Sequence, residues 1–142
     1  MAELDSLIKL RKHTVDEKRR ALAELYRQTE ILQKQKREVE AQMEQEKKLA
    51  EEMASLEASA YLGRYLEGAR KKIKGIDQSI RKLETRIAVA QEDIRNAFAE
   101  VKKIEITQRN RQNREKKARD KKEGQELDEI AIDQFRRQQE ED

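Results

Sequence analysis

Residues 62–104 read LGRYLEGARKKIKGIDQSIRKLETRIAVAQEDIRNAFAEVKKI. An apolar residue recurs through this stretch at alternating spacings of four and three, without a single polar interruption. This is the heptad period of a left-handed coiled coil, in which the apolar positions form one seam along a helix. The stretch predicts a long helix that packs along its seam against another helix. The seam positions are Leu62, Leu66, Ala69, Ile73, Ile76, Ile80, Leu83, Ile87, Ala90, Ile94, Ala97, Val101 and Ile104.

A weaker seam with the same period runs through the first half of the chain. Its positions are Leu4, Ile8, Arg11, Val15, Lys18, Leu22, Leu25, Thr29, Leu32, Lys36, Val39, Met43, Glu46, Ala50, Met53, Glu57 and Ala60. Three of its polar interruptions are Lys or Arg, whose aliphatic stems cover apolar surface while their charged heads reach water. This half is therefore expected to form a helix that needs a partner.

The segment between the two seams, SLEASAYLGRYLEG at residues 55–68, holds two of the four glycines. Glycine adopts backbone conformations that other residues avoid, and Ser55 or Ser59 is suited to cap the start of the second helix. We therefore predict an all-α fold, a long antiparallel two-helix coiled-coil hairpin forming a single domain over residues 1–142. Its first helix covers about residues 3–58, its bend about 59–65 and its second helix about 66–122. A short amphipathic segment covers about 125–137.

The composition agrees with an elongated helical protein. Of the 142 residues, 44% are charged and 4% are aromatic, which leaves too little bulk for a globular core. The absence of Pro favours long helices. The absence of Cys, of any long apolar run and of an apolar leader, given the charged start MAELDSLIKLRK, predicts a cytoplasmic location.

The terminal end of the hairpin is predicted to bind a partner. With a bend near residue 61, residue i faces about residue 122 minus i, so the apolar start of the first helix faces mostly polar residues. Residues 109–122, RNRQNREKKARDKK, contain eight basic and two acidic side chains. After Gly124, the sequence LDEIAIDQF carries a small apolar stripe. The predicted binding residues are Leu4, Leu7, Ile8, Arg109, Arg111, Arg114, Lys116, Lys117, Arg119, Leu127, Ile130 and Phe135.

Each of these features has an alternative interpretation. The basic run is a solvated helix face, a surface for an acidic protein or, less in keeping with its lack of aromatic residues, a nucleic-acid surface. The apolar end is a partner site or an oligomer contact. Tyr26 and Phe98 follow seam positions and form one exposed patch or fold over the seam edge. Tyr61 and Tyr65 pack the bend or form a docking tip.

Nothing in the sequence predicts catalysis, a small-molecule substrate, a metal or a cofactor. There is one histidine, His13, and there is no cysteine, glycine-rich phosphate loop, HExxH motif or acidic calcium loop. A two-helix rod also lacks the water-excluding concavity that an enzyme needs.

Two long helices, the AYLGRYLEG bend, the strongly heptad second helix and the final LDEIAIDQF together resemble the FliJ family of the flagellar type III export apparatus. The related stalk proteins of injectisomes, of the YscO type, are similar. The resemblance implies a cytoplasmic, non-enzymatic hairpin, peripheral at the inner membrane through its partners. It also implies binding to the hexameric export ATPase through the terminal end, and contacts with the export gate protein and with substrate-specific export chaperones. Nucleic acid is not expected as a partner.

Overall fold

The computed structural model describes residues 2–141, and over this range the chain contains two helices and no strand. Helix α1 spans Ala2–Met53 and helix α2 spans Leu56–Glu141. Contacts divide the chain into two compact units. We call His13–Ala97 the hairpin unit, and Met1–Lys12 together with Phe98–Asp142 the terminal unit.

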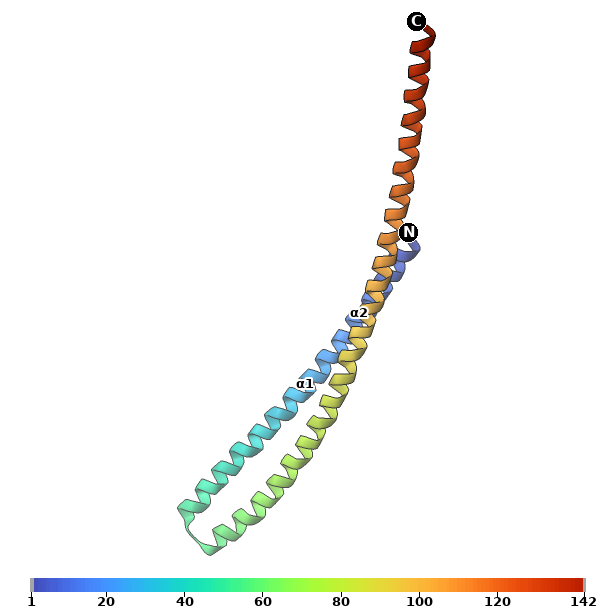
Figure 1. Ribbon diagram of the computed structural model, residues 1–142. Coiled ribbons are helices and arrows are strands. Elements are labelled where there is room, and N and C mark those ends of the chain that lie inside the picture. The colour runs from blue at the N-terminus through green and yellow to red at the C-terminus, as the bar shows by residue number, and fades with distance from the viewer. Residues whose placement is uncertain (1, 142) are drawn as a thin grey trace. The chain divides into compact units, whose positions relative to one another are not determined.

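In the hairpin unit, α1 and α2 run antiparallel from the turn that joins them (Figure 1). The core cluster is formed by Leu25 of α1 with Leu83 and Ile87 of α2. Leu22, Leu32 and Ala90 pack around it. The predicted all-α antiparallel hairpin is therefore confirmed.

Burial follows the predicted seams closely. Every one of the thirteen positions from Leu62 to Ile104 is buried or half-buried, and Val101 is the least exposed of them. On α1, the predicted positions from Leu4 to Ala50 are also buried or half-buried, except Arg11. The heptad period thus identified the faces by which the helices pack, because apolar residues that recur at spacings of three and four line up along one face of a helix.

The turn lies earlier than predicted, at Ala54 and Ser55. Ala54 adopts a left-handed backbone conformation with φ of 45°, and its N–H donates to the carbonyl of Ala50 at 3.1 Å. The Ser55 hydroxyl accepts a hydrogen bond from the N–H of Ala58 at 3.0 Å and so caps α2. The cap predicted at Ser55 is confirmed.

Several predicted boundaries were wrong. The expected bend at 59–65 lies inside α2, and neither Gly63 nor Gly68 has a positive φ. The first helix ends at Met53 rather than near 58, and the second begins at Leu56 rather than near 66. The second helix also continues past 122 to Glu141, so the segment 125–137 is part of α2. The helix continues because no Pro interrupts it and a single Gly124 costs only about 1 kcal/mol.

The earlier turn changes which residues face one another. In the hairpin unit, Lys36 pairs with Asp77 and Tyr26 with Gln91, so the numbers of facing residues add up to between 113 and 117. In the terminal unit, Asp5 pairs with Gln108 and Lys12 with Glu105, which gives the same range. The predicted relation, 122 minus i, is therefore too large by roughly one heptad. A shift of one heptad keeps both seams facing each other.

In the terminal unit, only the first turns of α1 accompany α2, which continues well beyond the N-terminus (Figure 1). With the observed register, α2 residues beyond about 115 have no counterpart on α1. All residues from 111 to 141 are exposed except the half-buried Gly124. Among the described residues, neither helix is apolar enough over a sufficient length to cross a membrane.

Candidate functional site

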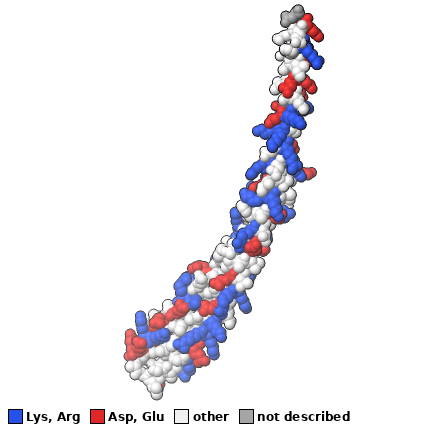
Figure 2. Space-filling view, in the orientation of Figure 1, with Lys and Arg blue, Asp and Glu red and all other residues white. Residues whose placement is uncertain are grey.

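The second half of the basic run at 109–122 lies beyond the reach of α1, whereas Arg109 and Gln112 still lie beside the first turns of α1. All side chains of the run are exposed, and Figure 2 shows clustered Lys and Arg on this part of the molecule. Eight cations against two carboxylates give a strongly positive length of helix. Such a surface attracts acidic partners over about 8 Å at physiological ionic strength.

An apolar stripe follows the basic run on the same helix. Leu127, Ile130 and Phe135 leave 66%, 54% and 60% of their surface exposed. At 100–103° per residue, the centre of the stripe lies roughly 115° or more around α2 from the face of Val101 and Ile104. The stripe is therefore not a continuation of the hairpin seam, and it points toward a different neighbour.

The apolar residues at the start of α1 are less available than predicted. Ile8 is buried, with 7% of its surface exposed, and Leu4 and Leu7 are half-buried. Val15, two seam positions after Ile8, is buried at 4%. The new register explains this difference, because it places Ile8 at the level of about residues 105–109, next to the end of the α2 seam at Ile104, rather than at about residue 114. Leu10 is the apolar side chain that remains exposed.

Polar contacts hold the start of α1 against α2 in the terminal unit. The Lys12 ammonium lies 3.5 Å from the Glu105 carboxylate, and Gln108 donates a hydrogen bond to Asp5. The hydrogen bond from Lys102, aided by the positive charges of Lys102 and Lys12, lowers the pKa of Glu105 against the opposing effect of desolvation. Beside these pairs lies a shallow groove of about 510 Å³ that Ile8, Arg109 and Gln112 also line.

Tyr26 and Phe98 have separate neighbours. Tyr26, in the hairpin unit, accepts a hydrogen bond from the side chain of Gln91 at 2.8 Å. Phe98, in the terminal unit, has the Lys102 ammonium 5.2 Å from its ring centre, a cation–π distance. Both rings are partly exposed. The shared patch was predicted from the relation 122 minus i, which differs from the observed register. The prediction of one patch that contains both rings therefore has no support from the structure.

The Tyr61 and Tyr65 rings stack on consecutive turns of α2, with centres 6.3 Å apart and planes 24° from parallel. Tyr61 is exposed and Tyr65 is half-buried. Desolvation raises the pKa of the Tyr65 hydroxyl, with smaller contributions from the charges of Glu46 and Tyr61. The rings lie on α2 after the turn rather than at the turn itself.

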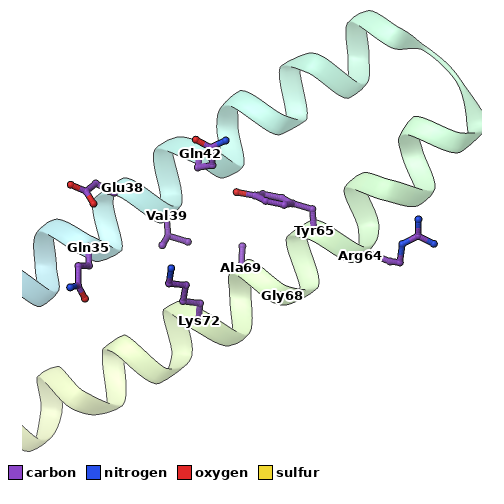
Figure 3. A pocket seen from close by; sticks show the side chains of 9 residues that line it. All are labelled: Gln35, Glu38, Val39, Gln42, Arg64, Tyr65, Gly68, Ala69 and Lys72. Atoms are coloured by element: carbon purple, nitrogen blue, oxygen red, sulfur yellow. The ribbon is translucent and has the colours of Figure 1, made fainter.

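Tyr65 also lines a groove that the sequence did not predict. It has a volume of about 720 Å³ and lies between α1 and α2 of the hairpin unit (Figure 3). Val39 and Ala69 point toward each other across it, and Tyr65 and Lys72 extend from α2 toward α1 (Figure 3). The small residues Gly68 and Ala69 leave this space. The signal in the sequence is this pair of small residues, which leaves little side-chain volume at this level of α2.

The described residues offer several surfaces for binding. Among the described residues, no cluster of three or more His, Asp or Glu side chains could hold a metal. The exposed features are the basic run, the apolar stripe, the aromatic pair and the grooves. Sequence reasoning missed Ile132 and Ile106, which are also exposed apolar residues of α2.

Comparison with known families gives one match. The family model described as flagellar FliJ protein matches residues 1–140. No curated protein and no solved structure matches the chain.

Proposed function

Because the chain belongs to the FliJ family of flagellar proteins, we propose that it is a non-enzymatic coiled-coil stalk of the flagellar type III export apparatus. Components of this apparatus act by binding one another. We propose that this stalk binds the hexameric export ATPase, and that it links the ATPase to the export gate and to the substrate-specific chaperones.

One observation carries this proposal. The last third of α2 has no partner on α1 and exposes a basic run followed by an apolar stripe. A helix with polar residues on most sides gains little stability by itself, so an exposed helix of this length favours a function in which another protein surrounds it. Insertion into a ring would supply contacts on every side of the helix.

The basic run and the apolar stripe each favour a different kind of surface on the partner. The basic run favours acidic surface on the ATPase, and Leu127, Ile130 and Phe135 favour an apolar sleeve. Leu4 and Leu7 contribute at the rim, since they are half-buried, and Ile8 supports them from the packed seam. A stiff helix that meets successive subunits differently biases their conformations, because binding shifts each subunit toward the state it prefers.

The rod offers further surfaces for the gate and the chaperones. Tyr61, Tyr65, Tyr26 and Phe98 are the aromatic residues we assign to these contacts, because aromatic side chains are enriched at interface centres. If the chain makes these contacts, it lies in the cytoplasm and is held at the inner membrane by its partners. No cofactor and no small molecule enters this function.

Binding of the purified export ATPase tests the proposal. We expect deletion of residues 125–142 to weaken binding by about tenfold or more, equivalent to about 1.4 kcal/mol, with no change in the melting of the hairpin. Arg114→Glu with Lys117→Glu should weaken binding at low salt and have a smaller effect at high salt. Matched reversals at Arg70 and Lys71, which are exposed in the hairpin unit, are the control.

Three results would count against the proposal. Undiminished binding by the truncated chain would exclude the terminal end as the ATPase site. Equal losses from the terminal and the control reversals would exclude a localised basic contact. Retention of the wild-type chain on RNA or DNA at physiological salt would favour a nucleic-acid partner instead.

A further inference from the structure

The turn end of the hairpin unit exposes four large apolar side chains, of which the proposed function uses Tyr61 alone. Met53 and Leu56 flank the turn and leave 70% and 89% of their surface exposed. Leu49, one turn before Met53, and Tyr61, on the second turn of α2, are about half exposed. We call these four residues the tip patch. Figure 2 shows mostly uncharged surface at the extreme turn end of the molecule.

A hollow lies within the tip patch. It has a volume of about 400 Å³ and lies between the last turns of α1 and the first turns of α2. Leu49 and Met53 line it on one side and Tyr61 on the other, while Ala50 and Ala58 form its floor. Small residues at these two positions leave the space open. The hollow is therefore a recess with apolar walls, of the kind that receives apolar side chains from a partner.

The short turn that positions the tip patch contains a strained residue. Ala54 has a positive φ, a backbone conformation that non-glycine residues avoid. The chain reverses direction within the two residues between the helices, so Met53 is the last residue of α1 and Leu56 is the first residue of α2. The apolar side chains thus extend from two rigid helix ends, which lowers the entropy lost on binding.

The charge around the tip patch is negative, although the chain as a whole carries a net charge of +3. Residues 40–60 contain six Glu and two Lys. Two of these carboxylates, Glu46 and Glu57, line the hollow itself. A partner that fills the hollow therefore gains from positive charge at the edge of its apolar face.

We propose that the tip patch binds an amphipathic helix of a partner protein whose apolar face is bordered by Lys or Arg. A recess between two helix ends accepts apolar residues spaced at three and four along such a helix. Two copies of this chain joined tip to tip would bring their acidic surfaces together. Anionic lipid would likewise repel the carboxylates around the patch. The charge thus favours a basic partner helix over both of these occupants.

A synthetic peptide provides the test, and the proposal does not depend on the ATPase contact. The peptide has about 14 residues, Leu at spacings of three and four, Lys along both edges and one Trp. The chain contains no Trp, so the fluorescence of the peptide reports binding directly. We expect Met53→Ser with Leu56→Ser to weaken binding at least about tenfold, because both side chains meet the peptide. Glu46→Lys with Glu57→Lys should weaken it in a salt-dependent manner.

Matched controls separate the tip from the rest of the surface. Val89→Ser and Glu84→Lys change an exposed apolar and an exposed acidic residue of α2 away from the turn, and should leave binding unchanged. Circular dichroism should show that all variants melt as the wild type does. Equal binding of a peptide with Glu at its edges, or equal losses in the tip and control variants, would overturn the proposal.

The alternative occupants give distinct results. A concentration-dependent dimer in light scattering that Met53→Ser with Leu56→Ser abolishes would show that a second copy covers the patch. Binding to phosphatidylcholine vesicles containing phosphatidylserine, lost in the same variant, would show that a membrane covers it. Either result would overturn the partner helix.

Discussion

Ala54 is the residue at which the chain reverses, and its backbone is strained. Its φ of 45° is the only positive φ of a non-glycine residue among the described residues. We expect Ala54→Gly to raise the free energy of unfolding by about 0.5–1 kcal/mol, because relief of the left-handed strain exceeds the added entropy of the unfolded chain. Urea unfolding followed by circular dichroism measures this.

The control for Ala54→Gly is Ala50→Gly, one turn earlier inside α1. Here the same change removes no strain, so it should lower the free energy of unfolding by about 1 kcal/mol. If both changes destabilise the chain equally, the reversal does not occur at Ala54.

Gly75 has no structural need to be glycine. It lies inside α2 with a negative φ, and a Cβ added to it would have no neighbouring atom within 4 Å. We therefore expect Gly75→Ala to raise the free energy of unfolding by about 1 kcal/mol, since Ala is the better helix former. Differential scanning calorimetry should show a higher midpoint. A lower midpoint would mean that the chain bends or is closely approached at this position.

The lowered pKa of Glu105 predicts that the stability of the terminal unit depends on pH. This pKa is lowered in the folded chain, mainly by the hydrogen bond from Lys102 and by nearby positive charges. A lowered pKa stabilises the fold above the unfolded value of about 4.3, and this stabilisation disappears as the pH falls through the folded value. Glu105→Gln should therefore melt below the wild type at pH 7.

The difference between the two melting temperatures should shrink as the pH falls through the lowered folded-state pKa, because the wild-type carboxylate then also becomes neutral. Glu92→Gln is a comparison from the hairpin unit, since Glu92 pairs only within α2, with Arg95 at 3.2 Å. A difference that persists unchanged at low pH would show that Glu105 acts through packing rather than through charge.

At the scale of the helices, the seam of α2 determines the hairpin. Ile80 is buried in this seam, whereas Val89 on the same helix is exposed. Ile80→Asp places an unpaired carboxylate against apolar side chains and should cost several kcal/mol, about 3–5. Val89→Asp should change the free energy of unfolding by less than about 0.5 kcal/mol. Thermal melting of the helical signal compares the two.

Ile80→Ala keeps this test informative if the Asp variant does not fold. Removing the buried side chain without adding charge should cost about 2–4 kcal/mol. Equal melting of the Ile80 and Val89 variants would show that this face of α2 is not the packed face.

The seams could be predicted from the sequence because their period is long and uninterrupted, whereas the turn could not. The bend was predicted near Gly63 and Gly68 because glycine is common in turns, but an α-helix tolerates isolated glycines. The informative signal was a break in phase. Continuing the alternation of the first seam beyond Ala60 reaches Arg64 and Glu67, whereas the second seam runs through Leu62 and Leu66. The two seams are therefore out of phase and do not share one helix face. The exposure of Met53, Glu57 and Ala60 shows that the first seam ends before these positions.

The candidate site was predicted in part. The exposure of the basic run and of Leu127, Ile130 and Phe135 follows from their lying beyond the reach of α1, which the charge pattern indicates. The burial of Ile8 and the tip patch depend on the register and on the exact turn. A heptad pattern does not fix these, because a slip of seven residues leaves both seams matched.

At the scale of the whole molecule, the chain distributes its charge unevenly. Basic residues dominate 109–122, and glutamates dominate the segments around the turn. A protein that binds different partners through different segments gains specificity from such a distribution, because each segment repels the wrong partner. Membership in the FliJ family places these surfaces in the flagellar export apparatus, and the proposed ATPase contact lies in the terminal unit.

Site-specific crosslinking in flagellated cells tests the proposed ATPase contact most directly. The chain has no cysteine, so each introduced cysteine is unique. Gln134→Cys lies beside the apolar stripe and Gln78→Cys is exposed in the hairpin unit; both carry a benzophenone label. We predict that the export ATPase is crosslinked from position 134 and not from position 78. Crosslinking from 78 alone, or an absence of the ATPase at both positions, would contradict a stalk that binds through its terminal end.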